Sequence, residues 1–154
     1  MSPKSLYRFF AIGEAFTWTL LISALITRLV NESLAIAVSV AGTIHGAMFL
    51  SYCTTSVLVG VNQRWRFGRI SSSVLLAIVP FATIPFDKHL MKQRALEGAW
   101  RTSPSEDPRD QRAFDRLFRW FISRPALLVL VLLLAIIALF SFLLFLGPPT
   151  QWFD

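Results

Sequence analysis

The chain has few of the residues that metal centres and disulfides require. It contains one cysteine and two histidines, and its 9 acidic residues are outnumbered by 15 lysines and arginines. The single cysteine, Cys53, excludes an intrachain disulfide and a metal site made of cysteines. His45 shares the apolar segments with one glutamate and one cysteine, whose spacings do not fit a zinc site of three or four ligands. We therefore expect no metal.

Motifs for cofactors and catalysis are also missing. The sequence has no glycine-rich phosphate loop and no nucleophile elbow. Haem ligation by His45 would need a second axial ligand, and the other histidine, His89, lies in a polar stretch. The net charge of +6 comes without a nucleic-acid recognition motif. The sequence predicts no cofactor, no nucleic-acid partner and no assembled catalytic centre, hence a protein that is not an enzyme.

Apolar residues dominate instead. They make up 55% of the 154 residues, which is too much for an ordinary soluble domain of this size. Four apolar segments stand out, at 9–30, 34–61, 70–86 and 125–146. A helix of about 20 residues crosses a hydrocarbon core of about 30 Å. We predict an all-α polytopic membrane bundle; Glu14 and the length of segment 9–30 argue against a signal peptide there.

Two of these segments carry marked features. In 34–61, Gly42 and Gly46 lie four residues apart, and such small residues let a neighbouring helix approach closely. We favour a neighbour within this chain over a partner protein. In 70–86, Pro80 and Pro85 remove backbone donors, so an uninterrupted straight helix is not expected. A kinked span and a re-entrant segment both remain open.

The long polar stretch, 87–124, is expected to contain an amphipathic helix over 108–123. Asp107 can cap this helix and Pro108 suits its first position. Phenylalanines and Leu117 then fall on one side and arginines on the other, with Asp115 able to pair with Arg119. We predict that the helix lies on the bilayer, where four arginines contact anionic headgroups or an acidic partner: Arg109, Arg112, Arg116 and Arg119.

The predicted organisation is a membrane core at 1–92, a polar loop at 93–124 and a last span with an aromatic interfacial tail at 125–154. Lysines and arginines favour the cytoplasmic side of a bacterial inner membrane. With four spans, that rule prefers an outside N-terminus. With a re-entrant third segment, it prefers an inside N-terminus and leaves only Arg28 outside. Both arrangements place 87–124 in the cytoplasm, and the side of the N-terminus stays open.

Two ionisable residues lie at membrane depth, Glu14 in the first segment and His45 in the second. Ionisable groups are costly there and form a candidate intramembrane polar site. Their depths do not match a direct ion pair, and Glu14 is more nearly level with Thr54 and Thr55 or with 71–73. Hydrogen bonding within the bundle is one interpretation. A proton or ligand path is the other, because histidine exchanges protons near neutrality.

Residues 7–92 carry a string of features in a characteristic order. They are Arg8-Phe9, Glu14, His45-Gly46 with Phe49 and Tyr52, an Arg-Trp-Arg loop around Trp65, Pro80-Phe81, and Phe86-Asp87 followed by a basic residue. This order resembles the YdzA-like family of small actinobacterial and Bacillus integral membrane proteins, a domain of unknown function. The resemblance implies a membrane core of three segments and no known activity.

Two functions compatible with these features are predicted. The first is a non-enzymatic accessory subunit that packs against other membrane protein subunits and lipids in a larger bacterial complex, with the respiratory-chain supercomplex as one possible host. The second is a small oligomeric transporter, channel or lipid-binding protein that uses Glu14 and His45 near the broken segment 70–86.

Overall fold

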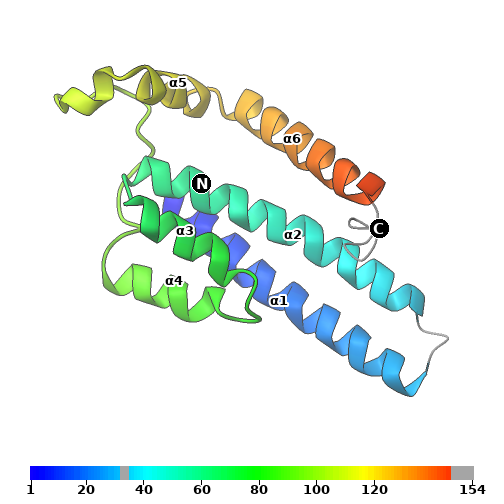
Figure 1. The fold of residues 1–154 in the computed structure, drawn as a ribbon. Helices are drawn as coiled ribbons and strands as arrows, with labels where there is room; N and C mark the ends of the chain where they lie inside the picture. The colour runs from blue at the N-terminus through cyan, green and yellow to red at the C-terminus, as the bar shows by residue number, and fades with distance from the viewer. Residues whose placement is uncertain (32–34, 147–154) are drawn as a thin grey trace. The chain divides into compact units, whose positions relative to one another are not determined.

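A computed structural model describes residues 1–31 and 35–146 (Figure 1). All regular structure in these ranges is helical. Contacts between residues divide the chain into two compact units, Met1–Ala99 and Trp100–Asp154. Each unit has its own architecture, and the predicted all-helical class is confirmed for the described residues.

Two long helices, α1 (Pro3–Val30) and α2 (Ala35–Asn62), form an antiparallel pair in the first unit (Figure 1). The Ser2 hydroxyl caps α1 by accepting a hydrogen bond from the Ser5 backbone N–H at 3.1 Å. The pair packs tightly at Gly13, where an added Cβ would lie 3.0 Å from Met48 Sδ. At Gly42 the nearest such atom, on Leu21, lies 4.0 Å away, an ordinary contact. The packing of these two helices therefore does not require a glycine at Gly42.

The apolar segment 70–86 is broken into parts of two short helices, α3 (Phe67–Leu76) and α4 (Thr83–Lys92). The six residues between them form a turn in which Phe81 has a φ of 64°. Pro80 lies in this turn. Pro85 is the third residue of α4, where a backbone N–H would have no partner within the helix. A turn that contains Pro80 thus separates two short helices, and the kinked span, one of the two predicted alternatives, is not confirmed.

The hairpin of α3 and α4 packs beside the half of the long pair where α1 begins (Figure 1). The approach of α3 to α2 depends on Gly60, because a Cβ there would lie 2.7 Å from Ile70 Cγ1. The turn is held to α1 by Trp18, whose indole N–H donates to the Ala77 carbonyl at 3.3 Å. Contacts with both long helices therefore position the hairpin.

The C-terminal ends of α2 and α4 lie together and have the same form. Each is followed by an arginine in the left-handed conformation, Arg64 with a φ of 53° and Arg94 with a φ of 54°. The residue after each arginine donates its backbone N–H back to the helix, as in a Schellman cap. The Trp65 indole N–H joins the two ends by donating to the Ala95 carbonyl at 2.8 Å.

The second unit contains a short 3₁₀ helix (Pro108–Gln111), α5 (Ala113–Ile122) and α6 (Pro125–Leu146). The predicted cap is confirmed, because Asp107 Oδ1 accepts the Arg109 backbone N–H at 2.9 Å. The predicted continuous helix over 108–123 is wrong, since Arg112 adopts an extended conformation between the two helices. The predicted aromatic tail lies outside the described residues.

Among the described residues, three helices are long and apolar enough to cross a membrane: α1, α2 and Pro125–Leu143 of α6. At about 1.5 Å per residue, α3 and α4 each extend only about 15 Å, half of a hydrocarbon core. Four full spans, one of the two arrangements that the sequence left open, are therefore not confirmed.

Candidate functional site

A cluster of fully buried hydroxyls from three helices lies in the first unit. The Tyr7 hydroxyl on α1 lies 2.7 Å from that of Tyr52 on α2 and 2.8 Å from that of Ser73 on α3. Ser73 also bonds Ser56 at 3.1 Å, and all four side chains are fully buried. Because each hydroxyl can both donate and accept, the cluster satisfies itself without any charge. The edge of the Trp65 ring packs against Tyr7.

Glu14 lies further along the same face of α1 and is also fully buried. Its Oε2 lies 3.2 Å from the hydroxyl of Thr83, the first residue of α4. The same hydroxyl lies 3.0 Å from the Ala11 carbonyl. Glu14 Oε1 has no hydrogen-bond partner among the described residues. The Trp18 indole lies near the carboxyl, but its N–H donates to Ala77.

His45 on α2 contacts α1 about one helical turn beyond Glu14, at Thr17 and Trp18. Its Nδ1 is 3.1 Å from the Thr17 hydroxyl, and its ring packs against Trp18 with a centroid separation of 4.4 Å. Thr17 donates to the Glu14 backbone carbonyl at 2.9 Å. Since that donation uses the only hydroxyl hydrogen, Thr17 accepts from His45, which fixes the hydrogen on Nδ1. The bonds link His45 to the backbone of Glu14 and not to its carboxylate.

The partners of these residues differ in part from those expected. Glu14 is bonded to Thr83, whereas Ser73, which was expected near its level, belongs to the hydroxyl cluster. Sequence reasoning did not include Tyr7 or Thr83 in a site. A signal for Tyr7 exists, since it precedes Glu14 by seven residues and so falls on the same helix face. Thr83 carries no such signal, because its position depends on the turn.

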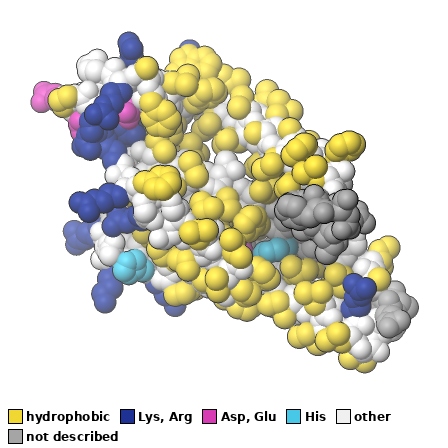
Figure 2. Space-filling model, in the orientation of Figure 1, with side chains coloured by type: hydrophobic (Ala, Val, Ile, Leu, Met, Phe, Trp, Pro, Cys, Tyr) yellow, Lys and Arg dark blue, Asp and Glu magenta, His cyan; other side chains and the backbone are white. Residues whose placement is uncertain are grey.

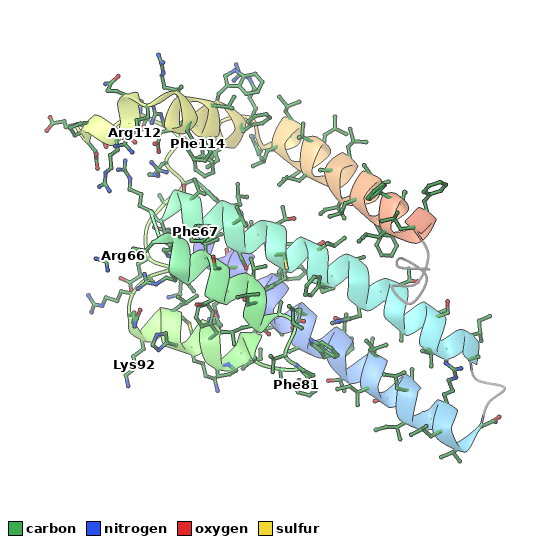
Figure 3. The ribbon with its side chains drawn as sticks, in the orientation of Figure 1. Arg66, Phe67, Phe81, Lys92, Arg112 and Phe114 are labelled. Carbon is green, nitrogen blue, oxygen red and sulfur yellow. The ribbon has the colours of Figure 1, made fainter. Side chains whose placement is uncertain are left out.

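Basic side chains gather at the end of the first unit where α1 begins and α2 and α4 end (Figure 2). One of them, Arg8, approaches Asp87 of α4 with Nε 3.3 Å from Oδ2. Asp87 is almost fully buried, and this burial raises its pKa above the ordinary value while Arg8 opposes the shift. Arg69 donates to Gln93 at 2.9 Å and so links α3 to the end of α4. Arg66 and Lys92 extend from this end (Figure 3).

The second unit has a charged centre around Asp110, whose side chain is only 2% exposed. Asp110 Oδ1 lies 3.2 Å from both Arg101 Nη1 and Arg119 Nη1, and Oδ2 accepts the Ser105 backbone N–H at 2.8 Å. Arg119 also donates to the Asp110 carbonyl at 2.6 Å. The expected Asp115–Arg119 pair is replaced by Asp115 with Arg101 at 2.9 Å.

The four arginines predicted to contact headgroups therefore fall into two groups, those that are paired within the unit and those that are exposed. Arg119 is 8% exposed and is used inside the unit, and Arg109 pairs with Asp107 at 2.8 Å. Arg112 and Arg116 are exposed. The apolar side of α5 is also exposed, with Phe114 62% and Leu117 55% exposed. The exposed surface of α5 is amphipathic, as predicted, but with fewer available arginines.

Nothing in the described part of the chain gathers three or more His, Cys, Asp or Glu side chains in a way that could hold a metal ion. The geometry is that of a helical membrane protein with a polar interior. The sequence comparisons agree with this class. Residues 4–92 match the family described as a domain of unknown function, DUF3817, and the chain belongs to that family. This confirms the expected kind of family, a membrane family of unknown function; the YdzA-like name itself stays a prediction.

A relative from Streptomyces coelicolor, which is named as a membrane protein, is 39% identical over 82 residues. The match covers 53% of this chain and 10% of the relative, so the chain spans only a small part of that protein's length. No solved structure matches the chain. The comparisons therefore support membrane localisation and leave the activity open.

Proposed function

We propose that the protein is a non-enzymatic accessory subunit of a larger bacterial membrane complex. The hydroxyl cluster carries this proposal. Its four side chains come from α1, α2 and α3 and bond one another, so their chemistry serves to join helices. A net hydrogen bond contributes about 0.5–1.5 kcal/mol, and a buried hydroxyl without a partner costs more. Such a centre suits a rigid scaffold.

The surfaces that remain available are apolar. In α6, Ser141 is the only polar side chain. None of the residues in Pro125–Leu143 is buried. The far end of α1 also carries exposed apolar side chains next to Arg28, with Leu29 and Val30 each 87% exposed. Lipid tails or the apolar helices of other subunits can cover such surfaces. A helix of another subunit replaces lipid where the two helices pack closely.

A topology with the N-terminus in the cytoplasm accompanies this proposal. Of the nine lysines and arginines in residues 1–99, eight lie at the end where α1 begins, and Arg28 alone lies at the other. With the α3–α4 hairpin re-entrant, 14 of the 15 basic residues fall on the cytoplasmic side. The loop 87–124 is then cytoplasmic, and Arg112 and Arg116 can contact anionic headgroups.

Purification tests the proposal. The full chain, tagged at its C-terminus and extracted in a mild detergent, is expected to bring down stoichiometric membrane partners, with respiratory-chain subunits as one specific possibility. A variant in which the α6 residues are shuffled keeps the same composition and serves as the control. The protein isolated as a clean monomer, or equal capture by the shuffled variant, would contradict an accessory role.

A small transporter, channel or lipid-binding protein is the second candidate. Glu14 favours it, because a buried carboxyl with a free oxygen lies beside the break between α3 and α4, and discontinuous helices often form transport sites. His45 would line the same path. Glu14→Gln should then abolish solute or proton flux in vesicles reconstituted with the full chain. Flux that is unchanged in this variant, or absent from the parent protein, counts against transport.

A further inference from the structure

The Thr83 hydroxyl faces two acceptors but has one hydrogen. The Ala11 carbonyl lies 3.0 Å from its oxygen and Glu14 Oε2 lies 3.2 Å from it. A hydroxyl donates once and accepts up to twice. If Glu14 is a carboxylate, it can only accept, so one of the two short contacts is not a hydrogen bond. If Glu14 is a carboxylic acid, both contacts are hydrogen bonds.

The surroundings of Glu14 also lack a positive charge. No ion pair with Glu14 occurs among the described residues, and Arg8 approaches Asp87 instead. Among the described residues, the side chains that interact with the carboxyl are Thr83 of α4, Trp18 of α1 and, electrostatically, Cys53 of α2, and none of them is a cation. A carboxylate without a partner in an apolar interior costs several kcal/mol, which protonation avoids.

We propose that Glu14 is a proton-binding site that fastens the α3–α4 hairpin to α1. In the proton-bound form, Glu14 Oε2 donates to the Thr83 hydroxyl, and Thr83 donates to the Ala11 carbonyl. Binding one proton converts the carboxylate into a neutral acid, and no other covalent bond changes. The other oxygen, Oε1, becomes the carbonyl of the acid, which carries less charge and needs less compensation when unbonded.

The protonation state of Glu14 makes the attachment of the hairpin to α1 depend on pH. When Glu14 releases its proton, the donation to Thr83 is lost and a charge without a partner remains beside the start of α4. His45 does not compensate, because its Nδ1 is bonded to Thr17 and the Thr17 hydroxyl donates to the backbone. We expect the hairpin to be held most firmly at low and neutral pH and to loosen in alkali.

Infrared spectroscopy of the full chain in lipid vesicles tests the protonation state directly. A protonated carboxyl has a C=O stretch that is separate from those of carboxylates and amides. We expect this band at neutral pH in the parent protein, its loss in Glu14→Gln, and its persistence in Asp87→Asn, which removes another buried acid. No band in the parent, or a band that survives in Glu14→Gln, would overturn the proposal.

Stability across the pH range tests the fastening. Glutamine keeps the shape and the neutral charge of the acid, so the melting temperature of Glu14→Gln should stay level where that of the parent falls in alkali. Thr83→Val removes the link between Glu14 and Ala11 and should lower the melting temperature, whereas Thr83→Ser should restore it. Parallel pH profiles for the parent and Glu14→Gln, or equal effects of valine and serine, would contradict the proposed site. This proposal does not depend on the accessory role.

Discussion

The two units of the chain bury polar groups in different ways. In the first, neutral hydroxyls join residues far apart in the sequence, such as Tyr7 and Ser73, which are 66 positions apart. In the second, charges join neighbours, such as Arg119 and the carbonyl of Asp110, which are nine positions apart. Hydroxyls satisfy one another at low cost in an apolar interior, while buried charges need a paired partner. The hydroxyl cluster of the first unit is thus long-range and neutral, alongside the Arg8–Asp87 ion pair, whereas the centre of the second unit is local and charged.

The largest effect is expected at the charged centre of the second unit. Asp110→Ala leaves Arg101 and Arg119 without their shared partner, and breaking a buried pair costs about 3 kcal/mol or more. The hydrogen exchange of the α5 amides should speed up accordingly. Glu106→Ala, on an exposed neighbour, is the control and should change little. Unchanged α5 protection in Asp110→Ala would mean that the charges do not hold this unit together.

Close packing in the first unit gives the next effect. In Gly60→Ala the new Cβ would meet Ile70 Cγ1 at 2.7 Å, so α3 must shift, at a cost of about 1–3 kcal/mol. Gly42→Ala is the matched control, because the new Cβ there would make only an ordinary contact with Leu21 at 4.0 Å, and alanine favours a helix by up to about 1 kcal/mol. Thermal unfolding in detergent should therefore shift in opposite directions. A stabilised Gly60→Ala would show that α3 does not depend on this approach.

The hydroxyl cluster should respond to loss of its central member. Ser73→Ala removes the side chain that contacts Tyr7, Tyr52 and Ser56 and leaves partners unsatisfied, at a cost of about 1–2 kcal/mol. Ser72→Ala, at the exposed neighbouring position, should be nearly neutral. Denaturation of both variants in the same detergent measures the difference. Equal stability would indicate that the cluster contributes nothing specific to the first unit.

The smallest effect concerns Asp87, the acid of the Arg8–Asp87 pair in the first unit. Because burial raises its pKa, the folded protein holds this proton more tightly than the unfolded chain. The resulting stability is present below the ordinary pKa of about 3.9 and is lost as the pH rises through the folded value. Asp87→Asn should flatten the dependence of the melting temperature on pH over that range, because asparagine does not titrate. A steeper profile in the variant would contradict this sign.

Helix location followed from the sequence where periodicity and composition were sufficient. Segments 9–30 and 34–61 coincide closely with α1 and α2, because a long apolar run satisfies its backbone within one helix. Segment 70–86 was less determined, since two prolines permit a kink or a turn. The turn at Phe81 depends on Trp18, 59 residues before the carbonyl that it binds, and no local pattern reports that contact.

The candidate site shows the same limit. Glu14 and His45 were recognisable because ionisable residues are rare in apolar segments. Their partners were not, because Thr83 reaches Glu14 only when α4 packs on α1. Arg119 was assigned to the membrane surface by its position on a helix face, whereas its charge is used by Asp110 across the break at Arg112.

By itself the sequence determined the membrane class, the long helices and the rare ionisable residues within them. These depend on composition and local periodicity, which reflect the transfer of side chains from water to lipid. Only the tertiary structure decided which hydroxyls meet, how segment 70–86 divides, and which side chain shares the Glu14 proton. These depend on contacts between residues on different helices, such as Thr83 and Glu14, which are 69 positions apart and whose geometry is set by helix packing.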